Sequence, residues 1–550
     1  MFMLVVMAIA AAAPEQAFAR LNEARLAPAE AKARLAEFVS TMKKAGLERS
    51  AAVLLASIAA DERQSEGVRA AAREELVGRA AQDPSVAQML MAAEPGKLPP
   101  ALSLQLARAH LEQALQLAPP AEGAAFEGLE RPPALVAASA QPLDKELAAE
   151  LGQAALVPQA PARAAPRASV EDEKAALREL DHARALAASV PAGDPSEADA
   201  REVSGLAALA AGDADSAAKD FLAVSQLPVK SGDAAPAARR DQAFLQLARL
   251  AYQSGDDARA ARLYQRVGRG APEWLDALFE ASWAHFRRGE DEKALGNLLT
   301  LHAPFFQGRF FPESLVLKAL VLYQNCRYAD ARKALAGFQQ RYRPLHDAFA
   351  AALAKLPTPQ SAYEFLARGP LELQRSEAGE ELARLEQEAD LAASVAAVSQ
   401  LAREIDSIDA RPAAFRTSAL AARLGPLARK VRIQLIESAG RKLLSRLEAE
   451  RAELRELLGQ SLRLAFEIAG REKELAAAPA EESGPAPARR RDAPQIEDDE
   501  VLWPFQGEYW RDELGSYRFQ LGERCRKARP PPQQATQPAP EPPKVGSATP

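Results

Sequence analysis

Cysteine, histidine and aromatic residues are scarce in this chain of 550 residues, which has two cysteines, five histidines and 6% aromatics. The histidines are dispersed, and none stands at metal-ligand spacing from a second histidine or a cysteine. A glycine-rich phosphate loop, a nucleophile elbow and a Cys-x-x-Cys pair are also missing. The sequence therefore predicts no enzyme, no metal site, no cofactor and no small-molecule ligand.

A surplus of positive charge is missing as well, because the formal net charge is −6. Nucleic-acid binding needs a clustered basic face, so this class of partner is not expected. The run Arg489–Arg491 is followed closely by four acidic residues at 497–500. Charges of opposite sign at this spacing neutralise each other in part, which favours a charged linker over a phosphate-binding patch.

The apolar run at residues 1–13 is followed by Pro14 and by Ala17-Phe18-Ala19. A short apolar run, a helix breaker and small residues at the −3 and −1 positions are typical of a secretory signal, with cleavage after Ala19. The run is shorter than the roughly 20 residues that a transmembrane helix needs. We therefore expect a periplasmic or otherwise exported chain without a transmembrane span. The alternative is an N-terminal helix packed in the core.

Alanine, leucine, glutamate and arginine dominate the composition, and alternating β-branched runs are absent. This composition predicts an all-α fold. Prolines and charge mark the predicted boundaries. The predicted segments are a signal peptide (1–19), an N-terminal helical region of degenerate repeats or a cap (20–118), an Ala/Pro-rich linker (119–168), a repeat array (169–355), long helices or a coiled coil (356–478), a charged linker (479–500), an aromatic docking segment (501–526) and a Pro-rich tail (527–550).

A five-residue spacing recurs in the middle of the chain, where a residue that suits a tight turn precedes an alanine. The pairs are Gly212 and Ala217, Gly255 and Ala260, Gly289 and Ala294, and Cys326 and Ala331. Successive turns are 43, 34 and 37 residues apart. This pattern resembles the tetratricopeptide family, whose helix pairs repeat about every 34 residues. The alternative is ordinary helical hairpins with coincidental spacing.

The best unit matches the tetratricopeptide pattern at several positions, and Ala319 keeps the register in the last unit. The matching residues are Phe244, Leu247, Ala248, Tyr252, Gly255, Ala260, Tyr264 and Pro272. Small residues let the paired helices approach, aromatic residues fill the space between pairs, and Pro272 is expected to end the second helix. The resemblance implies a superhelix with a groove for a protein segment. The candidate groove residues are Gln246, Arg249, Glu280 and His285.

Two long charged helices are predicted after the array, at 371–408 and 426–478. In the second, apolar positions recur every seven residues. One row is Leu447, Leu454, Ser461 and Ile468, and the companion row is Leu444, Arg451, Leu458 and Ala465. The pattern favours an antiparallel hairpin or a short coiled coil, and packing against a neighbouring helix of the same chain is the simpler interpretation.

Six aromatic residues lie close together near the C-terminus, namely Trp503, Phe505, Tyr509, Trp510, Tyr517 and Phe519. A free peptide of this kind would expose a large apolar patch, so we expect it to dock. In the cis hypothesis it lies on the array and Cys525 bonds to Cys326, the only other cysteine. In the trans hypothesis it is a bait for a partner.

Glu508 and Asp512 would share one face if residues 508–514 were helical, which makes a carboxylate pair possible. A solvated or salt-bridged pair is the simpler interpretation, because no apolar pocket or cationic partner is indicated.

An export signal combined with Tyr323-Gln-Asn-Cys-Arg-Tyr328 and the segment from Gly507 to Gly515 resembles cell-envelope repeat proteins of myxobacteria and other deltaproteobacteria. The chain departs from their lipoprotein members in lacking an anchor cysteine. This second resemblance covers two short segments and fixes no role. The export signal and the tetratricopeptide resemblance together favour a non-enzymatic scaffold of the cell envelope with protein partners. The alternatives are a structural subunit of a gliding-motility or envelope-assembly complex, and an enzyme acting on the cell wall.

Overall fold

The structure is a computed structural model. It describes residues 13–21, 28–61, 63–77, 86, 90–91, 98–118, 169–227, 234–306, 308–369, 379–386, 388–477, 501–502 and 504–521. The predicted linkers at 119–168 and 479–500 and the predicted tail at 527–550 lie outside these residues, as do Trp503, Cys525 and most of the apolar N-terminal run.

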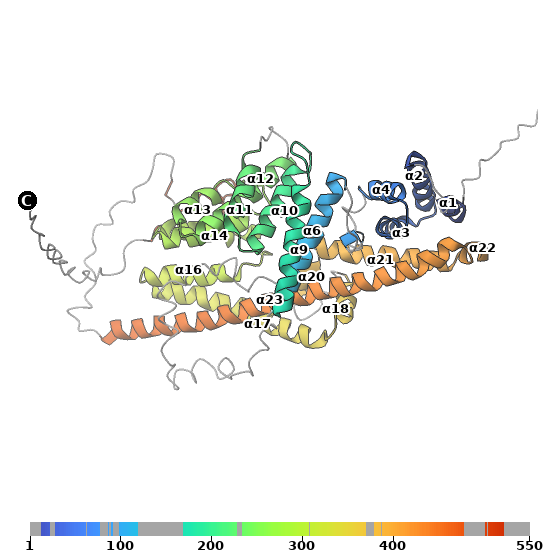
Figure 1. The fold of residues 1–550 in the computed structure, drawn as a ribbon. Coiled ribbons are helices and arrows are strands. Elements are labelled where there is room, and N and C mark those ends of the chain that lie inside the picture. The colour runs from blue at the N-terminus through green and yellow to red at the C-terminus, as the bar shows by residue number, and fades with distance from the viewer. Residues whose placement is uncertain are drawn as a thin grey trace, which may run out of the picture.

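Every regular element of the described part is a helix, and no strand occurs in it, which confirms the all-α prediction (Figure 1). The central helices are α9, which packs on α6 (Pro100–Leu117), and the antiparallel pairs that follow it, and we call them together the array. They are α9 (Val170–Ala188), α10 (Glu197–Ala210), α11 (Ala214–Ser225), α12 (Ala234–Gln253), α13 (Asp257–Tyr264), α14 (Trp274–Arg287), α15 (Asp291–Leu301), α16 (Pro312–Gln324) and α17 (Tyr328–Lys355).

The four predicted turn residues all adopt the left-handed backbone conformation, with φ of 80° at Gly212, 82° at Gly255, 71° at Gly289 and 56° at Cys326. In each turn the next residue donates its backbone N–H to a carbonyl five positions earlier, at 2.8–2.9 Å. This hydrogen bond closes the end of the first helix of each pair. Glycine adopts the conformation freely, whereas Cys326 does so at a cost of about 1 kcal/mol.

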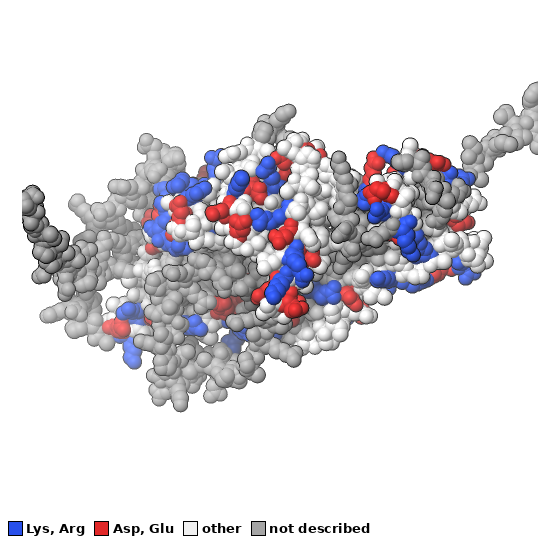
Figure 2. Space-filling model, in the orientation of Figure 1, with Lys and Arg blue, Asp and Glu red and all other residues white. Residues whose placement is uncertain are grey.

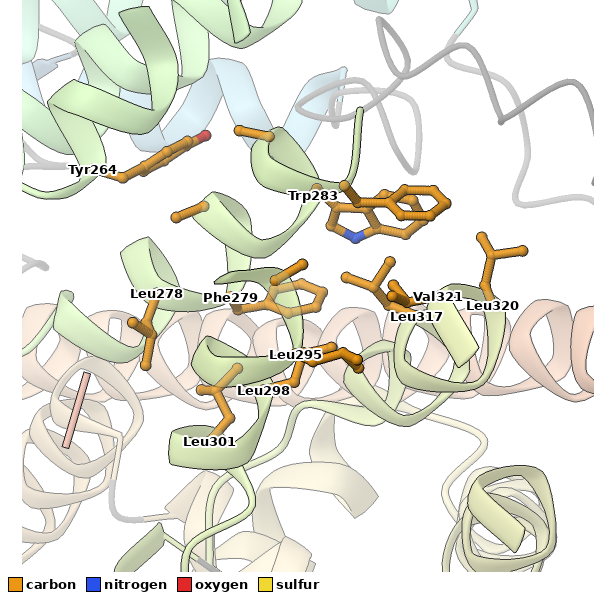
Figure 3. Close-up of a cluster of buried hydrophobic side chains, with 14 of the residues drawn as sticks. Tyr264, Leu278, Phe279, Trp283, Leu295, Leu298, Leu301, Leu317, Leu320 and Val321 are labelled. Atoms are coloured by element: carbon orange, nitrogen blue, oxygen red, sulfur yellow. The ribbon is translucent and has the colours of Figure 1, made fainter. Parts of the chain in front are cut away.

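The alanines that follow these turns are fully buried. Ala217, Ala260, Ala294 and Ala331 are each 0% exposed. Beyond them, large side chains of α13 to α16 fill a common core, as Figure 3 shows for Tyr264, Phe279 and Trp283. Pro272 does not end the second helix of its pair, because α13 stops at Tyr264 and Pro272 lies in the turn before α14.

The same turn occurs near the N-terminus, at a Gly-to-Ala pair that is not among the four predicted from the sequence. Gly46 has φ of 73°, and Leu47 donates its N–H to the Met42 carbonyl at 2.9 Å. Ala51, five residues after Gly46, is fully buried. The turn joins two helices of an N-terminal group, which consists of α1 (Pro14–Leu21), α2 (Pro28–Lys44), α3 (Glu48–Ala60) and α4 (Glu66–Leu76).

The longest helix, α23 (Ala419–Ala477), has 59 residues and therefore extends about 88 Å. It runs along one side of the molecule, under the N-terminal group at one end and under α16 and α17 at the other (Figure 1). Between these ends it packs on α18 and α21. The shorter helices of this region are α18 (Pro359–Leu366), α20 (Gly379–Glu386), α21 (Ala389–Asp409) and α22 (Ala413–Arg416).

The predicted start of this helix at Pro426 is seven residues too late. Leu420 and Leu424 are buried against the N-terminal group, and this packing holds the preceding two turns helical despite the proline. Helix α23 packs against α21, which agrees with the predicted contact between neighbouring helices of the same chain.

One predicted row of apolar residues on α23 is confirmed, because Leu447, Leu454, Ser461 and Ile468 are all at most 1% exposed. The companion row was placed one residue too late. The buried positions are Leu443, Glu450, Leu457 and Leu464 rather than Leu444, Arg451, Leu458 and Ala465. The charged residue in this row is Glu450, and Arg384 of α20 donates to it at 2.8 Å.

Helix α6 (Pro100–Leu117) connects the two halves of the fold. Its Leu102 and Leu106 belong to the core of the N-terminal group, whereas Leu104 and Ala107 pack in a cluster with α9 and α10. The N-terminal region therefore shares its core with the array and with the long helices.

Candidate functional site

The aromatic region near the C-terminus lies on the array, which is the cis arrangement of the two alternatives. We call its described residues 504–521 the C-terminal segment. The segment contains bends and turns but no helix. Its successive contacts run from the loop before α14, across α15, to the turn between α16 and α17.

Hydrogen bonds to the backbone of the segment fix its position. Residues of α15 accept three of them. Phe519 donates its N–H to the Glu292 carbonyl at 3.0 Å, and Gly515 donates to Thr300 Oγ1 at 2.9 Å. At the far end, Leu521 donates its N–H to Glu292 Oε1 at 3.1 Å.

Two arginines of the array bind carbonyl groups of the segment. Arg269 Nη1 donates to the carbonyl oxygen of Asp512 at 2.6 Å, and Arg327 Nη1 donates to that of Leu521 at 3.1 Å. The Arg327 guanidinium also lies 5.6 Å from the centroid of the Phe519 ring. Recognition through the backbone of an extended peptide uses few of the peptide's side chains.

Three apolar side chains of the segment are buried. Leu514 and Tyr517 form a cluster with Ala303, and Leu521 joins the core of the array. The Tyr517 hydroxyl donates to the Trp510 carbonyl at 3.0 Å and accepts from the Trp510 N–H at 2.9 Å. This pair of bonds folds the segment back on itself before it crosses α15.

Gly296 of α15 gives the segment the space it needs. A Cβ atom on Gly296 would lie 1.7 Å from the carbonyl oxygen of Tyr517. Because that oxygen belongs to the backbone, a change of rotamer cannot relieve the clash. Gly515 allows a second close approach, with φ of 89° and a hypothetical Cβ only 2.8 Å from the Trp274 ring.

The first half of the region keeps large apolar side chains in contact with solvent. Val501, Leu502, Phe505 and Trp510 are exposed. Phe305, which precedes the partly buried Phe306 beside the segment's cluster, is also exposed. The region thus divides into a buried half, which is bound to the array, and an exposed apolar half.

The carboxylate pair considered for Glu508 and Asp512 is not formed on a helix, because residues 508–514 make bends and a turn. Glu508 Oε2 accepts from the Gln506 N–H at 2.8 Å.

The four predicted groove residues are engaged in contacts within the array. Glu280 is buried and forms a bidentate pair with Arg249, with N–O distances of 2.7–3.1 Å, which ties α12 to α14. Gln246 is buried as well. His285 lies in the last turn of α14, where its Nδ1 is 2.6 Å from Glu290 Oε2.

The pair of His285 and Glu290 has shifted pKa values. Burial lowers the pKa of His285, although the Glu290 carboxylate opposes this shift. Burial would raise the pKa of Glu290, but hydrogen bonds from His285 and Arg288 outweigh it and lower the pKa to about 2. Glu290 is the N-cap residue of α15 and makes no side-chain cap hydrogen bond, but its negative charge is favourable at the N-terminus of a helix. The contact with His285 therefore has a structural explanation.

Sequence reasoning missed a cluster of titratable groups that belongs to two different helices. His110 of α6 lies beside Glu179 and His182 of α9, and the three side chains can offer ligand atoms within 4.8 Å of one another. The only local signal is the Glu-x-x-His spacing at 179–182, because His110 is 69 residues away from Glu179.

Comparison with protein-family models and with curated proteins finds no match to this chain. Among the described helices, none combines the length and the apolar character that crossing a bilayer requires. On the face drawn in Figure 2, basic and acidic side chains are interspersed over the array and the N-terminal group.

Proposed function

We propose that this chain is a non-enzymatic protein-interaction scaffold of the bacterial cell envelope, built on a tetratricopeptide-type array that holds an extended partner segment. The observation that carries the proposal is the bound C-terminal segment itself. Helices α14 and α15 already hold a non-helical peptide through backbone hydrogen bonds, a glycine gap and a buried tyrosine. A surface with this chemistry suits an extended segment of another protein.

The proposed place of partner binding differs from the groove suggested by the sequence. Gln246, Glu280 and His285 are buried, and Arg249 is paired with Glu280, so these side chains have little capacity for a further partner. The exposed apolar residues Val501, Leu502, Phe505 and Trp510 offer a second contact surface beside the bound half of the region. Exposed patches of this kind often mark interaction sites.

A disulfide between Cys326 and Cys525 is part of the proposal. The Leu521 carbonyl accepts from Arg327, the neighbour of Cys326, at 3.1 Å. Four residues span at most about 14 Å, so position 525 is within reach of Cys326. Alkylation without reductant followed by mass measurement tests it, and two modified cysteines would contradict it.

A structural subunit of a larger envelope machine, such as a gliding-motility or envelope-assembly complex, is the second candidate. The long helix α23 favours it, because this one helix packs on the N-terminal group and on the array. Under this alternative, contacts made by α23 hold the protein in its complex, and the array carries no separate ligand.

In-cell crosslinking followed by affinity purification separates the two candidates. The full chain is compared with a chain ending at Pro494 and with the same shortened chain carrying Gly296→Ala, in which the gap is closed. A partner that binds the vacated surface is captured better by the shortened chain than by the full chain, and Gly296→Ala removes this gain. Capture that is the same for all three chains would move the partner site away from α14 and α15 and favour the second candidate.

A further inference from the structure

We propose that His110, Glu179 and His182 form a binding site for a divalent transition metal, with Zn²⁺ as the expected ion, which ties α6 to α9. The proposal is independent of the scaffold function. It rests on the geometry of three side chains that come from two helices separated by a long connection.

Small residues bring the two helices close together at this place. Ala107 of α6 and Ala183 of α9 are fully buried in their common interface. Ala114, near the end of α6, lies with Ala176, near the start of α9, so the helices run antiparallel. His110 is one turn before Ala114 and therefore faces the turn of α9 that carries Glu179 and His182.

The three side chains already point at one another. His110 Nδ1 is 2.5 Å from Glu179 Oε2, and the rings of His110 and His182 have centroids 5.2 Å apart and planes inclined by 67°. All three ligand atoms lie within 4.8 Å of one another. Tetrahedral Zn²⁺ with bonds of about 2.0–2.1 Å needs ligand atoms roughly 3.4 Å apart, so a modest side-chain rotation completes the site.

The residue types suit this ion. Two imidazoles and one carboxylate are common ligands of zinc, and imidazole also accepts copper, nickel and iron. Glu179 is oriented by Gln113, whose Nε2 lies 3.3 Å from Glu179 Oε1, which is the kind of outer hydrogen bond that fixes a ligating carboxylate. His110 is buried, Glu179 is half-buried and His182 is exposed. An ion can therefore enter from the side of His182, where a fourth ligand can be water.

A bound ion would act as a clamp. Helix α6 also belongs to the core of the N-terminal group, and α9 begins the array. The chain between Leu117 and Val170 is too long to hold the two helices in register by itself. Metal ligation across their interface fixes the N-terminal group on the array and stabilises the folded state by mass action.

The test is a titration of the full chain, prepared without a polyhistidine tag, with Zn²⁺ in a calorimeter and with Co²⁺ in an absorption spectrometer. The variants are His182→Gln, whose side chain is exposed, and Glu179→Gln. The matched control is His346→Gln. His346 also has a carboxylate neighbour, Asp347 Oδ1 at 3.0 Å, but it is not part of a three-ligand group in the described structure.

We expect one Zn²⁺ per chain, a tetrahedral Co²⁺ spectrum and a higher thermal midpoint with metal. Each of the two site variants should lose more than the roughly 10–100-fold in affinity that removal of an outer-shell partner costs. The control should bind as the parent chain does. Absence of Zn²⁺ binding to the parent chain, or equal binding by both site variants and the parent, would overturn the proposal.

Discussion

Glu313 is an acidic residue placed where its charge is unfavourable. It lies in the first turn of α16, and burial raises its pKa from 4.5 to about 7, with a further contribution from Glu453 of α23. Between pH 4.5 and 7 the folded chain keeps the proton that the unfolded chain releases. The folded state therefore binds more protons, and stability falls as the pH rises through this window.

Replacing Glu313 by Gln removes this pH-dependent cost. The free energy of unfolding at pH 8 should increase by on the order of 1–3 kcal/mol, whereas the two proteins should be nearly equal at pH 4.5. Urea denaturation at both pH values measures the difference. Glu448→Gln, an exposed change on α23, is the control. A gain that is the same at both pH values would show that the carboxylate's ionisation is not responsible.

Gly296 decides whether the C-terminal segment can lie on α15. Alanine is favoured over glycine in a helix interior by up to about 1 kcal/mol, so Gly296→Ala should leave the array folded. Its methyl group would nevertheless meet the Tyr517 carbonyl. Hydrogen exchange of the Phe519 and Leu521 amides should become faster in this variant.

Gly337→Ala is a matched control for this experiment. Gly337 lies inside α17, and a Cβ atom there would meet nothing within 4 Å. Unchanged amide protection in Gly296→Ala, equal to that of the control, would mean that the segment does not depend on the gap at Gly296.

Some residues could be assigned from the sequence and others could not. The glycines and alanines of the turns were predictable because backbone conformation and close packing restrict these positions to few residue types. Gly296 carries no such local signal, since the contact that requires it comes from Tyr517, more than 200 residues later. The cluster of His110, Glu179 and His182 was missed for the same reason.

At the scale of helices, α3 depends on a residue of α21 for its N-terminal cap. Leu47 provides no side-chain cap, and the carboxylate of buried Glu404 accepts from the N–H groups of Arg49 at 3.0 Å and Ser50 at 2.7 Å. This contact replaces the local Ser, Thr or Asp cap that helices usually have. It therefore anchors the N-terminal group to the helices that follow the array.

Glu404→Ala should destabilise the protein by about 1–3 kcal/mol, because two backbone donors lose their partner in a buried place. Chemical denaturation measures the loss, and Asp406→Ala, an exposed change on the same helix, serves as control. Equal stability of the two variants would show that Glu404 does not stabilise the N-terminus of α3.

The helices were more predictable than their packing. A seven-residue repeat indicates that one side of α23 is buried, but apolar residues at 443, 444, 457 and 458 fit two rows equally well. The neighbouring helices decide which of the two rows is buried. Arg384 of α20 pairs with Glu450, so the row that contains Glu450 faces inward. The start of α23 was misplaced because packing on the N-terminal group outweighs the effect of Pro426.

At the scale of the whole molecule, the N-terminal helix bears on stability and on the proposed export signal. Helix α1 contains the proposed cleavage position, and its Ala17 and Phe18 are buried, with the Phe18 ring 5.8 Å from that of Phe38. A chain that begins at Arg20 lacks both side chains. Its N-terminal group should therefore be less stable, by about the 3–5 kcal/mol that Phe-to-Ala changes cost in cores.

Denaturation of chains that begin at Ala13 and at Arg20 measures this loss, and Phe18→Ala in the longer chain should reproduce most of it. Equal stability would contradict the structural role of Phe18. The intact mass of the protein recovered from cells then shows which of the two forms exists.

If the surface of α14 and α15 binds a non-helical peptide, it should also bind that peptide when it is supplied as a separate molecule. A fluorescent peptide with the sequence of residues 501–521 is added to a chain that ends at Pro494, and anisotropy is recorded. We expect saturable one-to-one binding, which is lost in Gly296→Ala and kept in Gly337→Ala. Absence of binding to a truncated chain with an unchanged helical spectrum, or equal affinity in Gly296→Ala, would contradict it.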